Sequence, residues 1–343
     1  MLGFSPLPRT AEAALRDAEH PQPTVRRSAL ADLGRHAHAA DRERAILAII
    51  ALLRSDPSPD LRAEAAVALA DADATGARAA LLAALDDPAE RVRQMALLAL
   101  GELGEPGDQE LGARLLGAVD AVEPALRFQA LIACERLLPE RAAELVARAL
   151  GDADDEIRTM ALRLARKRWP NADGPDALLE LGRRALDDSA ARVRAAAALW
   201  LAPRREPAAE RVLVGVVTGS VPLEPGPDLG EAFELAGSLG LAEARPALER
   251  RAFGLLGRTS ALGWHARIAL ARLGDARARR AIVKGLGAWT RDARTLAVVA
   301  AGRAGLSEAR DGIARLRGDL RRAEPEAVEE ALAALAAADG PGD

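Results

Sequence analysis

The chain has 343 residues, half of them apolar, and its 47 Lys or Arg against 51 Asp or Glu leave a net charge of −4. A single cysteine, Cys134, excludes an intramolecular disulfide and a cysteine-based zinc cluster. No apolar run approaches the roughly 18 residues of a transmembrane helix, and residues 1–6 do not resemble a secretion signal. We therefore expect a soluble, cytoplasmic protein, and the abundance of Ala, Gly and Arg suggests a bacterial source.

A repeated phrase organises the chain: turn residues, then Val-Arg, then an Ala/Leu-rich stretch. Its clear copies begin at Val25, Leu61, Val92, Leu126, Ile157 and Val193. Weaker copies lie near Glu231, His265, Leu296 and Ala327. The spacing averages about 34 residues, which is typical of stacked helical repeats. Because Ala and Leu are strong helix formers, each period predicts a pair of helices.

The third period shows the expected layout of one pair. A first helix is predicted over 75–85 and a second over 89–103, with the turn at Asp86-Asp87-Pro88. Gly101 and Gly104 are expected to end the second helix. Counted in this way, the chain holds about ten pairs, the first helix spanning 10–18 and the last 325–337.

The stretch DDPAERVRQMALLALGELG, residues 86–104, resembles the HEAT-like repeat first described in phycobiliprotein lyases, a subclass of the HEAT superfamily. The resemblance is strong over residues 20–202 and weaker from 206 onward. It implies an all-α, right-handed α-solenoid of about ten helix pairs. We expect regular repeats over 1–202 and divergent ones over 203–343, in one continuous solenoid. Such arrays serve as scaffolds, adaptors, lyases and a few nucleic-acid enzymes, so the resemblance predicts fold better than function.

An arginine follows the first position of each clear copy, and an aspartate precedes four of these arginines by six residues. The residues are Arg26, Arg62, Arg93, Arg127, Arg158 and Arg194, with Asp56, Asp87, Asp152 and Asp188. A guanidinium matches a carboxylate or turn carbonyls well, which predicts a ladder of pairs between adjacent repeats. His20 and Ala121 replace the aspartate at two copies, where we expect the ladder to be interrupted. A row of anion-binding sites is the alternative.

The second helices also carry side chains opposite their apolar stripe, which we expect to line the concave side of the solenoid. Candidate partner contacts there are Val67, Gln94, Leu98, Phe128, Ile132 and Thr159. An exposed apolar patch of this kind marks an interface. The alternative is that packing between second helices half-buries these side chains.

The segment 244–303 is strongly basic, with 13 Lys or Arg against three acids and with Trp264 and Trp289 among them. Candidate contacts are Arg250, Arg251, Arg258, Arg267, Arg277, Arg280 and Lys284. They could dock an acidic protein surface, bind nucleic acid or form a solvated helical face. The loop 218–227, with three Pro and two Gly, is either a tolerated insertion or a binding or hinge element.

The sequence offers no catalytic constellation, and we predict neither a cofactor nor a metal site. His36 and His38 point about 200° apart on a helix, and Cys134 has no histidine within its repeat. We therefore expect a non-catalytic, protein-binding scaffold or adaptor that uses its concave surface. The alternatives are nucleic-acid binding through 244–303 and, less favoured, a lyase or chaperone acting on a cofactor-bearing protein.

Overall fold

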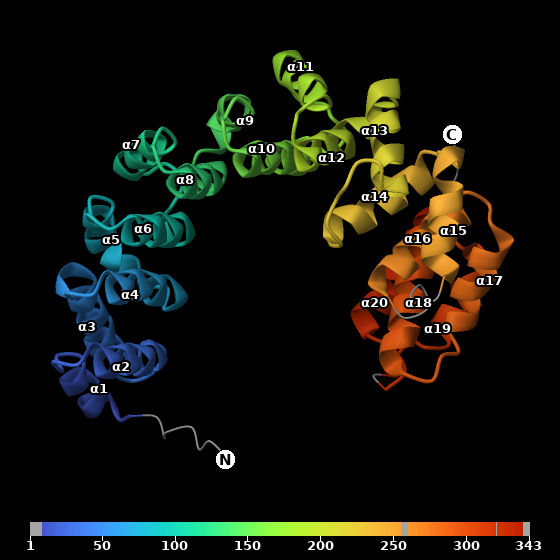
Figure 1. Cartoon of the computed structure of the whole chain (residues 1–343). Helices are drawn as coiled ribbons and strands as arrows, with labels where there is room; N and C mark the ends of the chain where they lie inside the picture. The colour runs from blue at the N-terminus through green and yellow to red at the C-terminus, as the bar shows by residue number, and fades with distance from the viewer. Residues whose placement is uncertain (1–8, 255–259, 320, 339–343) are drawn as a thin grey trace. The chain divides into compact units, whose positions relative to one another are not determined.

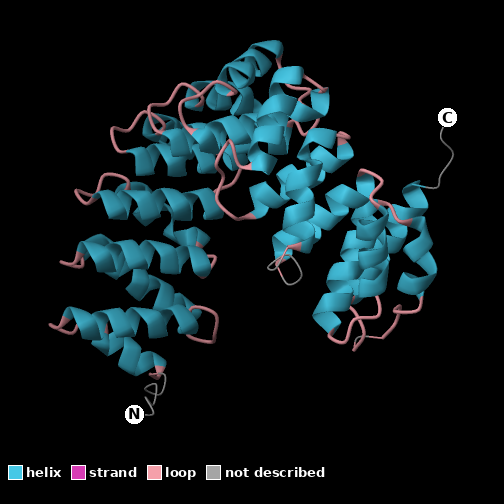
Figure 2. Cartoon of the chain, turned by 45° about the vertical axis from the view of Figure 1, so that its right-hand side comes forward, coloured by secondary structure: helices cyan, strands magenta, loops and turns pink. Residues whose placement is uncertain are grey.

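The computed structural model describes residues 9–254, 260–319 and 321–338. Over these residues the chain forms twenty α-helices and no strand (Figures 1 and 2). The helices follow one another as ten pairs, so the predicted all-α class and the predicted number of pairs are confirmed. Contacts divide the chain into two compact units, Met1–Met160 and Ala161–Asp343. The boundary predicted at 202/203 separates regular from divergent repeats in the sequence. As a domain boundary it stays a prediction.

Unit 1 contains the first four pairs and most of the fifth. The first helices of its pairs are α1 (Ala11–Asp17), α3 (Arg42–Ser55), α5 (Arg78–Ala84), α7 (Gln109–Ala118) and α9 (Ala142–Ala149). The second helices are α2 (Pro23–His36), α4 (Pro59–Asp71), α6 (Glu90–Leu103), α8 (Pro124–Leu137) and α10 (Asp155–Arg168). The last two turns of α10 belong to unit 2. Short 3₁₀ turns, η1 (Thr75–Ala77) and η2 (Pro139–Arg141), lead into α5 and α9.

Unit 2 contains the remaining pairs. Their first helices are α11 (Asp176–Ala185), α13 (Pro207–Thr218), α15 (Arg245–Phe253), α17 (Ala276–Gly285) and α19 (Arg310–Ala314). Their second helices are α12 (Ala191–Leu201), α14 (Pro227–Ser238), α16 (Ala261–Arg272), α18 (Arg291–Ala304) and α20 (Pro325–Ala338). The 3₁₀ turns here are η3 (Ala202–Arg204), η4 (Ala242–Ala244) and η5 (Ser307–Ala309).

Within unit 1 the second helices lie side by side in one layer and the first helices form the other layer (Figure 1). The core runs between the layers. Val92, Ala96 and Leu100 of α6 are at most 1% exposed, which confirms the apolar stripe predicted at every fourth residue. Gly101 does not end α6 but lies inside it, where a side chain would come within 3.0 Å of Ala133 on α8. Its absence allows the two helices to approach closely.

The arginine ladder joins each turn to the next repeat. Arg62 donates through Nε and Nη2 to the two carboxylate oxygens of Asp87, both at 2.8 Å, and through Nη1 to the carbonyl of Asp56 at 2.8 Å. Asp87 in turn accepts from the backbone N–H of Ala89 at 2.9 Å. Arg26 with Asp56 and Arg127 with Asp152 repeat the two-pronged pairing at 2.7–2.9 Å. One guanidinium thus satisfies its own turn and the carboxylate of the following one.

The predicted interruption at Ala121 is wrong. Arg93 reaches Glu123 instead, at 2.7 Å, because the longer glutamate side chain two residues later supplies the missing carboxylate. Arg158 and Arg194 bond the carbonyls of Asp152 and Asp188 in their own turns, at 2.9 and 2.6 Å.

One arginine of the row, Arg294, was not predicted from the sequence. Arg294 donates to the carbonyls of Ala288 and Trp289 at 2.6 and 3.0 Å, the same six- and five-residue offsets that Arg127 uses. The ninth repeat therefore begins near Ala293 and not near Leu296. Its turn has Ala288 at the position where four of the six clear copies have an aspartate, so the pattern did not reveal where this repeat begins.

Ladder pairing changes the proton affinity of the aspartates. Hydrogen bonds from Arg62 and Arg127 hold the pKa of Asp87 and that of Asp152 below the usual range, against the effect of burial. At Asp56 burial would raise the pKa, but the bonds from Arg26 and the Ser58 N–H outweigh it and the pKa is lowered. A lowered folded-state pKa contributes stability above the unfolded pKa of about 4, and this contribution is lost as the pH falls through the folded value.

Replacing Asp87 with alanine is expected to destabilise the fold by about 1.5–3 kcal/mol, because it leaves the half-buried Arg62 without its charged partner. Asp86→Ala is the matched control, since Asp86 is 72% exposed and its pair with Arg114 contributes about 0–1 kcal/mol. Urea unfolding followed by circular dichroism measures both. Equal losses in the free energy of unfolding would show that the ladder pair contributes no more to stability than the exposed pair of Asp86 and Arg114.

Candidate functional site

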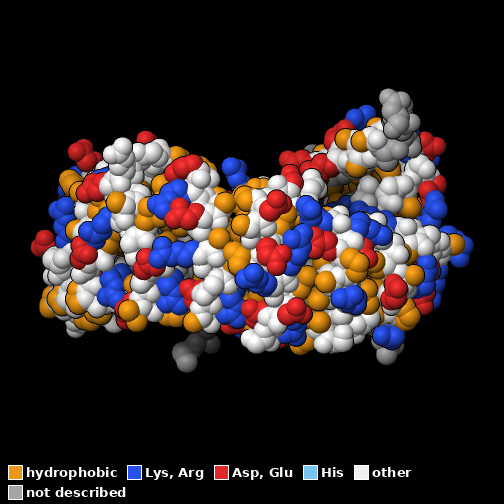
Figure 3. All heavy atoms as spheres, turned by 90° about the horizontal axis from the view of Figure 1, so that it is seen from above, with side chains coloured by type: hydrophobic (Ala, Val, Ile, Leu, Met, Phe, Trp, Pro, Cys, Tyr) orange, Lys and Arg blue, Asp and Glu red, His pale blue; other side chains and the backbone are white. Residues whose placement is uncertain are grey.

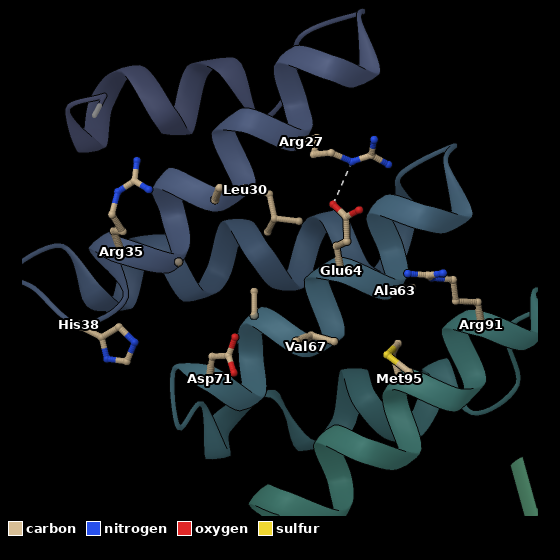
Figure 4. A pocket seen from close by; sticks show the side chains of 13 residues that line it. Arg27, Leu30, Arg35, His38, Ala63, Glu64, Val67, Asp71, Arg91 and Met95 are labelled. Carbon is tan, nitrogen blue, oxygen red and sulfur yellow. Dashed lines mark hydrogen bonds and ion pairs between the residues drawn. The ribbon is translucent and has the colours of Figure 1, made fainter. Parts of the chain in front are cut away.

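A groove of about 510 Å³ crosses three successive second helices of unit 1 (Figure 4). Leu30 of α2, Val67 of α4 and Met95 of α6 supply its apolar floor. We call this feature the α2–α4–α6 groove. Its lining consists of Arg27, Leu30, Ala31, Gly34, Arg35, His38, Ala63, Glu64, Val67, Ala68, Asp71, Arg91 and Met95.

Small side chains make the hollow. Ala31 and Gly34 face it from α2, and Ala63 and Ala68 from α4. A Cβ atom added to Gly34 would meet nothing within 4 Å, so this position opens directly onto empty space. Because helices stacked in register bring equivalent positions together, small residues at the same level of neighbouring repeats form one continuous depression.

Charged side chains stand around the groove. Arg27 of α2 donates to Glu64 of α4 at 3.0 Å, which links the two helices at one end (Figure 4). Arg35 bonds Asp32 of its own helix. Arg91 is exposed in the first turn of α6 and makes no ion pair within the described part of the chain. An apolar floor with a few charged groups is the usual composition of a binding site.

The structure places the predicted contact residues differently from expectation. Val67 lines the groove. It is half-buried, as the packing alternative proposed, and so are the other predicted apolar and amide contacts, Gln94, Leu98, Phe128 and Ile132. Their role as partner contacts stays a prediction. Thr159 is only 5% exposed and its hydroxyl donates to the carbonyl of Asp155 at 2.6 Å, so it does not belong to an open surface.

A second hollow, of about 900 Å³, lies in unit 2 between α14, α16 and the Arg303 end of α18. Pro225, Gly226 and Pro227 form one side of it, which places the end of the loop 218–227 at a cleft. The start of that loop packs on its own helix, since the Val221 N–H donates to the carbonyl of Gly215 at 3.0 Å. Whether the loop is a binding element stays a prediction.

The cleft holds a carboxylate and imidazole pair that the sequence analysis missed. His265 Nδ1 lies 2.6 Å from Glu234 Oε1, and Arg303 donates to the same oxygen at 3.0 Å. Gly230 makes room for the ring, because a Cβ there would lie 2.8 Å from His265 Cδ2. Glu234 and His265 are 31 residues apart, one repeat, so a search for neighbouring His and Glu residues could not find them.

Ion pairs also connect α14 to helices two pairs away. Arg163 and Arg166 of α10 reach Asp228 at 2.6 and 3.2 Å, and Arg166 reaches Glu231 at 3.0 Å. In α12, the second helix of the intervening pair, Ala195 and Leu199 are only 1% and 2% exposed. These two positions are equivalent to those predicted to lie on the concave surface. Because both side chains are buried, this part of unit 2 is covered at the level where unit 1 carries a groove.

The candidate contacts of the basic segment are not all exposed. Arg267 is 6% exposed, stacks over the Trp264 ring at 4.9 Å and donates to the carbonyl of Ala252 at 3.0 Å, so its predicted docking role is wrong. Arg258 lies outside the described residues. The remaining candidates are exposed: Arg250, Arg251, Arg277, Arg280 and Lys284.

Three further observations concern the reactivity of Cys134, metal binding and membrane-spanning helices. Burial raises the pKa of the Cys134 thiol to about 12, which disfavours the nucleophilic thiolate at neutral pH. Over the described ranges, no three His, Cys, Asp or Glu side chains are grouped as metal ligands would be. No helix in the same ranges combines the length and apolar character needed to cross a bilayer.

Residues 46–122 match the family model for HEAT repeats. The match lies within unit 1 and covers less than a quarter of the chain. A comparison with curated proteins finds no match. Among solved structures, Escherichia coli YIBA superposes with a TM-score of 0.53 at 16% identity, covering 78% of this chain and 93% of that one. Kap121p bound to Nup53p gives 0.51 at 15% identity, covering 96% of this chain and 40% of that one.

The complex of CpcE and CpcF of phycocyanin lyase from Nostoc sp. gives a TM-score of 0.42 at 18% identity, covering 82% of this chain and 96% of that one. At such identities the likeness to YIBA and Kap121p concerns the fold alone. Both are consistent with the helical solenoid that the repeat pattern predicted.

Two glutamates of α14 have pKa values shifted in opposite directions. Partial desolvation raises the pKa of Glu231, whose side chain is still 47% exposed; the Asp228 and Glu234 carboxylates add to the shift and Arg166 opposes it. Burial would also raise the pKa of Glu234, but His265 and Arg303 outweigh it and hold that pKa below its usual value. Ionised Glu231 therefore opposes folding, whereas ionised Glu234 favours it.

The two matched variants Glu231→Gln and Glu234→Gln are expected to change the pH dependence of stability in opposite senses. As the pH rises from about 3.5 to 6.5, Glu231→Gln gains stability relative to the parent chain and Glu234→Gln loses it, because only the parent carries the ionising group. Urea unfolding across this pH series measures both differences. Parallel curves for the two variants would contradict the assignment.

Proposed function

We propose that this chain is a non-catalytic, protein-binding scaffold or adaptor whose α2–α4–α6 groove accepts an apolar segment of a partner protein. The observation that supports this most directly is the groove itself, with floor side chains drawn from three consecutive repeats. Burying an apolar side chain in such a hollow removes its surface from water at about 25 cal/mol per Å².

The groove favours a particular kind of segment. Its volume of about 510 Å³ suits a few apolar side chains rather than a whole domain, and grooves between helices commonly accept the apolar face of an amphipathic helix. Arg91, exposed and without an ion pair among the described residues, stands at the edge formed by α6. We therefore expect an acidic residue beside the apolar anchors of the partner.

The comparison with Kap121p supports the proposal by analogy only. That protein, of similar fold, was solved bound to Nup53p. Proteins of similar fold need not bind similar partners. The proposal therefore rests on the groove and not on the resemblance. A cytoplasmic location and a bacterial source stay predictions from composition.

The groove can be filled without disturbing the fold. Gly34→Met places a side chain into open space from within α2, and Gly117→Met does the same on α7, away from the groove. Both glycines lie near the end of a helix, and a Cβ atom added to either would meet nothing within 4 Å. Both replacements favour helix formation by up to about 1 kcal/mol.

Selection of a random peptide display library on the full chain is expected to enrich peptides with apolar residues at helical spacing next to an acid. Their affinity should fall at least about tenfold, or 1.4 kcal/mol, for Gly34→Met and remain unchanged for Gly117→Met, as measured by fluorescence anisotropy. Peptides that bind both variants equally, or a selection that enriches none, would refute the groove as the binding site.

A further inference from the structure

Unpaired positive charge gathers on two neighbouring helices of unit 2. Arg250 and Arg251 lie in the last turn of α15, and Arg277, Arg280 and Lys284 lie along α17. All five are exposed, and none makes an ion pair within the described ranges. We call these five residues the cationic patch.

One contact joins the two helices that carry the patch. The guanidinium of Arg277 stacks on the Phe253 ring at 3.9 Å, which joins the start of α17 to the end of α15. Arg277, Arg280 and Lys284 follow one another at intervals of three and four residues, so they share one face of α17.

Two acids beside α17 already have partners. Asp275 caps α17 through the Ala278 N–H and pairs with Arg245 at 3.3 Å. Glu308 of η5 pairs with Arg279 at 2.9 Å. The five side chains of the patch therefore keep their positive charge. They repel one another, and a bound anion would reduce this repulsion.

This arrangement differs from the rest of the molecule. Most arginines described here meet a carboxylate, and in the face shown in Figure 3 positive and negative side chains are interspersed. Residues 161–343 carry 29 basic against 24 acidic side chains, whereas residues 1–160 carry 18 against 27. The patch lies in the basic part of the chain.

An exposed aromatic side chain follows α17. Trp289 is 98% exposed and lies four residues beyond Gly285, the last residue of the helix. Its carbonyl is held by Arg294 at 3.0 Å, so the backbone is fixed while the indole remains free. Trp and Arg are the side chains most enriched at protein-binding hot spots, and fixing them in advance lowers the entropy lost on binding.

We propose that the cationic patch and Trp289 form a docking surface for an acidic segment of another protein, with an apolar residue of that segment against the indole. A protein is favoured over nucleic acid because the chain is negative overall and residues 1–160 carry the acidic excess, which repels a long polyanion. This surface is separate from the α2–α4–α6 groove and does not depend on it.

The test uses the full chain and two fluorescent probes: a 16-residue glutamate peptide with one central leucine, and a 16-nucleotide single-stranded DNA. Charge reversal at Arg280 and Lys284 together is compared with reversal at Arg54 and Arg211, which are exposed, lie on α3 and α13 and make no ion pair within the described residues. Both double variants change the net charge equally. Anisotropy is measured from 50 to 300 mM salt.

We expect the peptide to bind with an affinity that falls as salt rises. Reversal of Arg280 and Lys284 should lower this affinity at least about tenfold, whereas the control reversal should change it less than about twofold. Trp289→Ala should weaken binding of the peptide that contains leucine and leave binding of an all-glutamate peptide unchanged. Equal losses in both double variants, no peptide binding, or tighter binding of the DNA through the same residues would overturn the proposal.

Discussion

In unit 1, four guanidinium groups each bond the turn of their own repeat and a carboxylate of the next repeat. Carbonyls of the turn before a second helix have no partner within that helix, and in seven repeats an arginine five or six residues later satisfies them. The same group then meets a carboxylate, as in Arg62 with Asp87 and Arg127 with Asp152. Adjacent repeats are thereby held at a fixed offset along their axes.

That fixed offset explains how binding features arise without a dedicated pocket. Within a unit, side chains at the same level of successive second helices become neighbours. Where they are small, as at Ala31, Gly34 and Ala68, a hollow opens across several repeats. Where side chains are long and charged, as at Arg163 of α10 and Asp228 of α14, they reach past the intervening α12 and cover the surface there. The ladder recurs along unit 1, whereas the side chains that it aligns vary.

The sequence predicts those features that depend only on neighbouring repeats. The helix pairs, the apolar stripe and three ladder pairs recur at a fixed period, so one repeat suffices to predict them. The groove depends on side-chain sizes that coincide across three repeats, and the Glu234, His265 and Arg303 contacts join residues 31 and 69 positions apart. Glu123 shows a further limit, since a longer acid two residues away replaces the aspartate that the pattern required.

The ladder also frees the turns for recognition. Each arginine bonds the turn through carbonyl oxygens, which every residue type supplies, so the side chain at that position is not needed for stacking. Val122 and Trp289 occupy equivalent turn positions, each five residues before its arginine, and are 89% and 98% exposed. Because the backbone is held and the side chain is unconstrained, such a position can vary in size and polarity without weakening the array. Stability and surface chemistry are thus separated within a single turn.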